Sequence, residues 1–293
     1  MSNLKEIRTR IASVESTQKI TSAMKLVSAA KLRRAQNTIL HLRPYSHKLN
    51  EILQNLSSSM EISEDNSLFT QRVPNRVLLI TIASNRGLCS AFNANIIKEV
   101  HRIVNEKYKT QFLNGKLELI CIGKKAIEQL QKYYNVVYAN ESLLETPHFE
   151  EIATIAAGLI NDFEQKKIDK VEIVYNRFVN PATQKITIEN YLPVVNMEPG
   201  SSIQTKVLDY LFEPSRQELM NELIPKILKL QLYKALLDSI ASEHGARMTS
   251  MAKATDNAIE ILKELKIKYN NARQAAITNE LNEIVSGAEA LKN

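Results

Sequence analysis

The residue types that most often carry out chemistry are sparse in this sequence and poorly spaced for it. Its five histidines are His41, His47, His101, His148 and His244. None belongs to an HExxH motif, and His41 and His47 fall on different faces of a helix because they are six residues apart. The two cysteines form no CxxC pair, and no GxSxG motif marks a nucleophilic serine. We therefore expect no bound metal ion and no catalytic residue.

Phosphate binding is not predicted either. Neither GxGxxG nor GxxxxGK[ST] occurs, and Gly123-Lys124-Lys125 lacks both the earlier glycine and the Ser or Thr that would hold magnesium. The segment Ser84-Asn85-Arg86-Gly87 follows an apolar run, where a ligand-binding loop would lie. We interpret it as a tight turn and helix cap that uses Asn85 and Gly87. No nucleotide cofactor is expected.

Positive charge is concentrated at the start of the chain. Residues 1–50 contain ten Lys or Arg residues and only two acidic ones, Glu6 and Glu15, in a chain of 293 residues with a net charge of +6. This bias favours an acidic partner, which could be nucleic acid, acidic protein loops or anionic lipid. Within it, a basic stretch has no acidic residue and would encircle a helix as a collar: Lys25, Lys31, Arg33 and Arg34.

Helix-breaking residues are rare. The chain has 7 glycines and 8 prolines among 293 residues, so long helices are expected, and a β-sandwich or propeller with its many turns is excluded. Cys89 and Cys121 lie in or beside apolar sequence and are interpreted as small buried hydrophobic residues. No run of 18 apolar residues and no signal-peptide core occurs, which favours a reducing cytoplasmic compartment.

Both ends of the chain have the pattern of long helices. The first is predicted to run to about Leu56, with a kink near Pro44, and its heptad seam begins with Leu4, Ile7, Ile11 and Val14. After a shift of phase, the stripe continues through Thr17, Ile20, Met24 and Val27. The second helix opens with a capping box at Ser215 and Glu218 and runs to about Leu291. Its seam is predicted at Leu262, Leu265, Tyr269, Ala272 and Ala276, followed after one residue by Ile277, Leu281, Ile284, Ala288 and Leu291.

The middle of the chain alternates between strands and helices. Strands are predicted at 77–82, 117–122 and 136–138, helices at 92–108, 124–134 and 149–166, and a hairpin at 170–178 and 185–192. The order predicts a small, partly parallel, doubly wound (Rossmann-like) sheet with a hairpin at one edge. The predicted fold class is thus α/β: a long antiparallel coiled coil (1–58 and 209–291) with an inserted α/β domain at 75–200. A helical bundle would need shorter connections.

Several segments together resemble the gamma subunit of rotary ATP synthases. IRTRIASVESTQKITSAMKLVSAAKLRRAQ (7–36) is similar to that family's N-terminal helix, and ITNELNEIVSGAEA (277–290) to its C-terminal signature. Further matches are YLFEP (210–214), ASEHGARMTSMAKATDNA (241–258) and YNNARQAAIT (269–278). SNRGLCSAFN (84–93) resembles the family's SDRGLCG-type loop, with Asn85 for the usual acid and Ser90 for the usual glycine. The resemblance spans essentially the whole chain and indicates a bacterial type.

This resemblance implies a non-catalytic central-stalk subunit, one copy per complex, that turns inside a ring of alpha and beta subunits. Its α/β domain would sit beside the epsilon subunit and the membrane c-ring, whose proton- or sodium-driven rotation it transmits, on the cytoplasmic face of the inner membrane. The residues implied to contact beta-subunit loops are Met24, Lys25, Lys31, Arg33, Arg34, Arg273, Gln274, Thr278 and Glu280. Those implied for the c-ring and epsilon end are Tyr210, Phe212 and Glu213.

Two other classes of protein were weighed. A basic coiled-coil module that binds nucleic acid would need base-stacking aromatic residues, and residues 1–44 contain none. A doubly wound enzyme with helical extensions would need a phosphate loop, and the sequence has none. The rotor interpretation is therefore preferred.

Overall fold

The computed structural model describes residues 2–58, 67–194 and 215–290 of the chain. These fall into two compact units. Unit 1 comprises Met1–Ser28 and Arg247–Asn293, and unit 2 comprises Ala29–Ala246. The two long terminal helices, α1 (Ser2–Ser58) and α6 (Arg216–Ala290), each contribute to both units. The three-part division of the chain proposed from the sequence stays a prediction.

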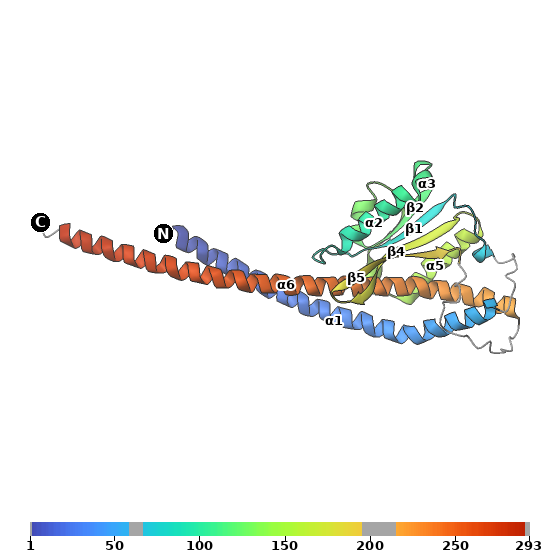
Figure 1. Ribbon diagram of the computed structural model, residues 1–293, viewed down its shortest axis with the longest axis horizontal. Helices are drawn as coiled ribbons and strands as arrows, with labels where there is room; N and C mark the ends of the chain where they lie inside the picture. Colours follow the sequence, from blue (N-terminus) through green and yellow to red (C-terminus); the bar gives the residue numbers. More distant parts are fainter. Residues whose placement is uncertain (1, 59–66, 195–214, 291–293) are drawn as a thin grey trace. The chain divides into compact units, whose positions relative to one another are not determined.

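Unit 2 contains a five-stranded sheet with the order β3-β2-β1-β4-β5 (Figure 1). Its strands are β1 (Val77–Ile82), β2 (Leu117–Ile122), β3 (Asn135–Asn140), β4 (Lys170–Asn180) and β5 (Thr183–Leu192). The first four run parallel, and β5 returns antiparallel to β4 as the predicted hairpin. The predicted doubly wound, partly parallel sheet with a hairpin at one edge is confirmed, and the structure places β1 at its centre. All six residues of β1 are buried, as a continuous apolar run predicts for a central strand.

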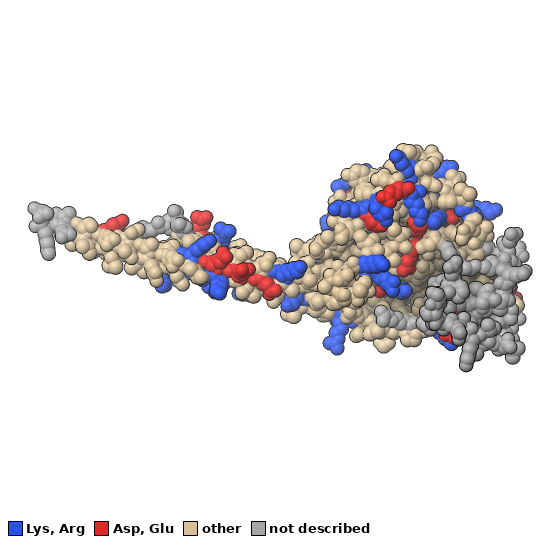
Figure 2. Space-filling view, in the orientation of Figure 1, with Lys and Arg blue, Asp and Glu red and all other residues tan. Residues whose placement is uncertain are grey.

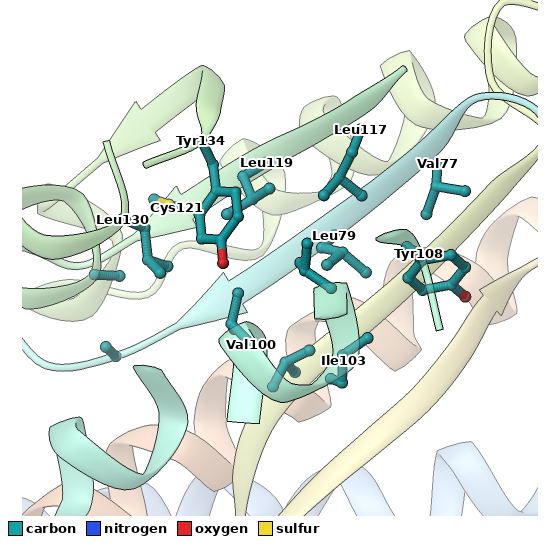
Figure 3. Packing of buried hydrophobic residues seen from close by; sticks show 14 residues of the cluster. Val77, Leu79, Val100, Ile103, Tyr108, Leu117, Leu119, Cys121, Leu130 and Tyr134 are labelled. Carbon is teal, nitrogen blue, oxygen red and sulfur yellow. The ribbon is translucent and has the colours of Figure 1, made fainter. Parts of the chain in front are cut away.

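One face of the sheet is covered by α2 (Phe92–Glu106) and α4 (Lys124–Leu130), with the short α3 (Lys109–Leu113) beside them. Alternate strand residues pack against these helices, since side chains along a strand alternate between its faces (Figure 3). Members of this core are Val77, Leu79, Val100, Ile103, Tyr108, Leu117, Leu119, Cys121, Leu130 and Tyr134. Cys121 lies within it and Cys89 is also buried, which confirms that both cysteines pack as small hydrophobic residues.

The opposite face of the sheet meets α5 (Phe149–Glu164) and the part of α6 that belongs to unit 2. Helix α5 buries one apolar side that includes Ile152, Ala156 and Phe163. The hairpin is tied to α6: the Tyr191 hydroxyl donates to the Leu228 carbonyl at 3.1 Å, and the Ser242 hydroxyl donates to the Asn176 carbonyl at 2.9 Å. Sheet and helix therefore form one core within unit 2.

The terminal helices match their predicted extents, and α1 and α6 run through Pro44 and Pro225 respectively. At the start of α6 the backbone N–H of Glu218 donates to the Ser215 hydroxyl at 3.2 Å, as the capping box predicts. The prediction was less accurate for α4, which ends at Leu130 instead of Tyr134. Tyr134 turns into the core, where its hydroxyl lies 2.5 Å from Nδ1 of His101. Tertiary packing of this ring thus ends the helix early.

Candidate functional site

A doubly wound sheet usually binds ligands where its strand order reverses, which here is between β1 and β4. The loop after β1 uses its polar groups internally. The Ser84 N–H donates to Oδ1 of Asn93 at 3.0 Å. At the start of α4, the Lys124 N–H donates to Oδ1 of Asn85 at 3.0 Å, and the Lys125 N–H to the Ser84 carbonyl at 3.0 Å. The backbone N–H groups of Ser84, Lys124 and Lys125 are therefore engaged within the protein.

Gly123 also serves packing in this loop. Its φ is +100°, and a Cβ at this position would lie 2.2 Å from the Ala83 carbonyl oxygen. Only glycine fits such a close approach. The interpretation of the loop as a turn and cap holds for Asn85, which caps α4. The left-handed conformations of this loop fall on Leu88 (φ 62°) and Ser90 (φ 55°).

Other site types were sought among residues 2–58, 67–194 and 215–290. Within that part of the chain, no group of three His, Cys, Asp or Glu residues could hold a metal ion. None of the helices described there combines the length and apolar character that crossing a membrane requires. The exposed surfaces of the terminal helices are candidates for function.

In unit 1, α1 and α6 pair through a seam. The predicted seam residues at the start of α1, from Leu4 to Val14, are half-buried. On α6 the partners are Met251, Ala258, Leu262 and Leu265, which are buried, and Tyr269, Ala272 and Ala276, which are half-buried. The predicted continuation through Ile20 and Val27 was wrong, since these are 56% and 57% exposed. The seam passes through Gln18, Thr21 and Ser28 instead, because the helix keeps one phase where the apolar pattern shifts.

Two contacts fix the register of this pairing. The Thr21 and Thr255 hydroxyl oxygens lie 2.9 Å apart, and Nζ of Lys266 lies 3.8 Å from Oε1 of Glu15. The helices are therefore antiparallel, and Leu4 lies opposite about residues 272–277 at the same register. The structure describes α1 from Ser2, so beyond that level no described residue of α1 lies opposite α6. Apolar side chains there are accordingly exposed: Ile277, Leu281, Ile284 and Val285.

The predicted beta-contact residues of unit 1 fall into two groups. Met24 is half-buried and Lys25 is exposed, both on α1. The second group is exposed on α6 near its apolar end: Arg273, Gln274, Thr278 and Glu280. From the register, about 30 Å of coiled coil separates the two groups, at 1.5 Å per residue. The structure brings the members of each group together but keeps the groups apart.

Three further predicted residues lie in unit 2. Lys31, Arg33 and Arg34 are exposed and flank the buried stripe of Leu32, Ala35 and Ile39. Among the residues described by the structure, none of these three cations, nor Lys25 or Arg273, forms an ion pair. Basic and acidic side chains lie next to one another along the coiled coil on the face that Figure 2 shows.

Tyr210, Phe212 and Glu213 lie outside the described residues. One feature was missed: α1 directs Ile20, Leu26 and Val27 outward, beside Met24 and Lys25, with Leu26 68% exposed. Because the segment is apolar, its pattern predicted that these side chains pack in the seam. Only the orientation of the helix in the structure shows that they form an exposed apolar surface.

Fold and surface together define a class of protein: a two-helix antiparallel coiled coil with an inserted doubly wound α/β domain and exposed surfaces along its helices. The family model described as ATP synthase matches residues 3–291. The chain is 51% identical to the ATP synthase gamma chain of Flavobacterium johnsoniae, covering 99% of each, and 44% identical to that of Geobacter sp., covering 100% of each. It therefore belongs to the ATP synthase gamma chain family.

Solved structures agree on the fold. A chain of the Euglena gracilis mitochondrial ATP synthase (OSCP/F1/c-ring, rotational state 3) superimposes with a TM-score of 0.67 at 20% identity, covering 99% of this chain and 95% of that one. A chain of the Tetrahymena thermophila central stalk and c-ring gives 0.60 at 22% identity, covering 80% and 99%. The predicted fold class and family are thus confirmed.

Proposed function

We propose that this chain is the non-catalytic central rotor of a bacterial ATP synthase, which couples ion-driven rotation of a c-ring to the conformational cycle of catalytic beta subunits. Family membership supports this role. The observation that carries it furthest is the end of α6, which extends past the start of α1 with exposed apolar side chains at Leu281, Ile284 and Val285. A single helix with an apolar surface suits the end of an axle that turns within an apolar sleeve.

The proposed partners are the alpha and beta subunits around the coiled coil, and the epsilon subunit and c-ring at the α/β domain. Tyr210, Phe212 and Glu213 are proposed for the latter contact. The complex would be attached peripherally to the cytoplasmic face of the inner membrane, with protons or sodium ions as the coupling ion.

The proposed beta contacts divide as the surfaces do. Arg273, Gln274, Thr278 and Glu280 would engage one set of beta loops near the tip of the coiled coil. Met24, Lys25, Lys31, Arg33 and Arg34 would face acidic loops lower down. Exposed cations of this kind contribute about 0.2–1 kcal/mol per ion pair and are weakened by salt, so they can guide rotation without locking it.

The role is tested by co-purifying the tagged chain with alpha and beta subunits and measuring ATP hydrolysis. Arg273→Ala with Gln274→Ala should lower ATP turnover, because a guanidinium–carboxylate hydrogen bond contributes about 1.5–3 kcal/mol. The control, Lys98→Ala, changes an exposed cation on the α/β domain. Unchanged ATP turnover and assembly in the double variant would contradict the proposed tip contact. Failure of the chain to recover alpha and beta subunits would contradict the proposed rotor role.

A further inference from the structure

A groove of about 740 Å³ lies in unit 2 between the edge strand β3 and helix α5, on the sheet face opposite α2 and α4. Its floor includes Leu78 of β1 and Ile120 of β2. One wall is a single side of α5, whose residues follow a spacing of three and four: Glu151, Thr154, Ile155, Gly158 and Asp162. A Cβ added at Gly158 would meet nothing within 4 Å, so the groove is open at this position.

An irregularity in β3 directs two apolar side chains into the groove. Val136 pairs with Leu119, but the next residue of β2, Ile120, pairs with Tyr138, so Val137 is an additional residue in the edge strand. Such a bulge changes where side chains point. Val136 packs against the α2 and α4 core, whereas the consecutive Val137 and Tyr138 both line the groove. They are 49% and 39% exposed.

The edge itself is open and apolar. Within the described part of the chain, β3 pairs only with β2, so its other side offers backbone hydrogen-bonding groups. Edge strands are commonly protected by lysine, proline or inward-facing charge. The residues of β3, Asn-Val-Val-Tyr-Ala-Asn, include no charge and no proline. An edge of this kind beside an apolar groove indicates a surface that a partner covers.

The charge of the groove indicates the charge that a partner should carry. Three carboxylates line it, those of Glu118, Glu151 and Asp162, and none of its described lining residues is Lys or Arg. Asp162 is partly neutralised by Lys167, whose Nζ lies 3.2 Å from Oδ1 in an exposed pair. The other two face the groove from β2 and α5. A complementary ligand therefore carries positive charge next to an apolar anchor.

We propose that this groove binds an extended, basic segment of another protein, which lies along the open edge of β3. An apolar side chain of the segment packs on Val137, Tyr138 and Ile155, and its Lys or Arg residues face Glu118 and Glu151. An extended segment fits better than a helix, since only a strand can use the free backbone groups of β3. This surface belongs to the α/β domain and goes beyond the rotor contacts of the coiled coil.

The test places a photo-cross-linking benzoylphenylalanine at Val137 in the purified ATP synthase complex that contains the full chain. The matched control carries it at Val179, which is 55% exposed on the hairpin of the same unit. The expected result is an adduct from position 137, absent from position 179, on one segment of another subunit that contains Lys or Arg. Selective loss of assembly at position 137, with unchanged circular dichroism, would also support an interface there.

A second arm tests charge. Glu118→Lys with Glu151→Lys should lower the adduct yield about threefold or more, and 500 mM salt should lower it in the same direction. Glu106→Lys, on the exposed side of α2, is the charge control, and the Gln pair at 118 and 151 replaces the Lys pair if folding is affected. Equal yields at 137 and 179, an adduct with lipid or an acidic segment, or insensitivity to both charge and salt would overturn the proposal. A wild-type chain that recovers no alpha or beta subunits would instead contradict the proposed function.

Discussion

Gly123 and Gly158 show how differently two glycines of the same domain are used. Gly123 has a positive φ and lets the start of α4 approach the Ala83 carbonyl closely. Gly158 is an interior residue of α5 with open space around its Cα. The same residue type therefore carries a packing constraint in one place and none in the other.

Replacing Gly123 with Ala should lower the free energy of unfolding by about 2–4 kcal/mol, since the new Cβ meets backbone and the φ is unfavourable. Replacing Gly158 with Ala should raise it by about 0.5–1 kcal/mol, since alanine favours a helix interior. Urea unfolding of both variants measures the difference. Equal effects would contradict the close approach at Gly123.

The thiol of Cys121 provides a pH prediction. Burial raises its pKa to about 12, from an ordinary value near 9. The unfolded chain therefore loses this proton at a lower pH than the folded chain, and stability is lost as pH rises from about 9 toward 12. Burial also raises the pKa of Tyr191, which adds in the same direction.

Urea unfolding at pH 8, 9.5 and 10.5 should show stability that is constant at first and then falls, approaching about 1.4 kcal/mol per pH unit for each such group. Cys121→Ala should reduce the slope. At pH 8 the native thiol should resist iodoacetamide, while the urea-unfolded chain reacts. Rapid labelling of Cys121 in the native chain would show that it is not buried.

At the scale of elements, the seam of unit 1 is unusual in being polar where α1 passes Thr21. The two hydroxyls are 2.9 Å apart, and Thr255 also lies 2.8 Å from the Met251 carbonyl of its own helix. The Thr21 hydroxyl likewise lies 3.1 Å from the Gln18 carbonyl, and either hydroxyl can donate to the other, so the contact between them helps to specify the register of α1 on α6. Apolar residues at these two positions could pack in more than one register, so they would specify the register of the two helices less well.

A double-mutant cycle tests this pair. Thr21→Val or Thr255→Val alone should destabilise unit 1 by about 0.5–1.5 kcal/mol, because one hydroxyl loses its partner. Both changes together should be nearly neutral, because two apolar side chains of similar shape then fill the seam. Thermal unfolding followed by helical circular dichroism gives the coupling. Additive losses would mean that the two hydroxyls do not interact.

The edge strand and the sheet centre also behave as separate elements. β1 is buried throughout, so its apolar run suffices to specify it. β3 is largely exposed, and its bulge depends on how it meets β2. This agrees with β1 and β2 having been predicted with correct bounds, whereas the third strand was predicted as 136–138 and extends from Asn135 to Asn140.

At the scale of the whole molecule, the end of α6 is the feature that can be tested most directly in the assembled complex. Removal of the residues after Ser286 should weaken assembly or rotation by degrees without abolishing ATP hydrolysis, since the exposed apolar surface at Leu281, Ile284 and Val285 remains. ATP hydrolysis and subunit recovery are measured together. Complete loss of hydrolysis in fully assembled complexes would point to a direct catalytic role of the removed residues.

The basic collar of Lys25, Lys31, Arg33 and Arg34 can also be tested in the assembled complex. Single changes of Lys25 or Lys31 to Ala should alter the ATPase rate or its salt dependence only mildly and leave assembly intact, because each exposed ion pair contributes about 0.2–1 kcal/mol. ATPase assays at 50 and 300 mM salt measure this. A severe loss from one substitution would indicate a fixed salt bridge and contradict the collar.

The sequence alone was sufficient to predict the long helices, the succession of strands and helices along the α/β domain, and the family. Scarce Gly and Pro and continuous apolar runs act locally, and the segments 7–36 and 277–290 are specific enough to be recognised. It also placed the exposed polar residues near the tip of α6, since no partner is needed to leave Arg273 or Gln274 outside the seam.

Other features depended on contacts between distant residues and were decided only by the tertiary structure. The phase of α1 around Ile20 and Val27 follows from its register on α6, which Thr21 and Thr255 set. The groove beside β3 depends on a bulge that exists only in the paired strands. A pattern along the chain specifies which residues are apolar, but packing determines which of them face a partner.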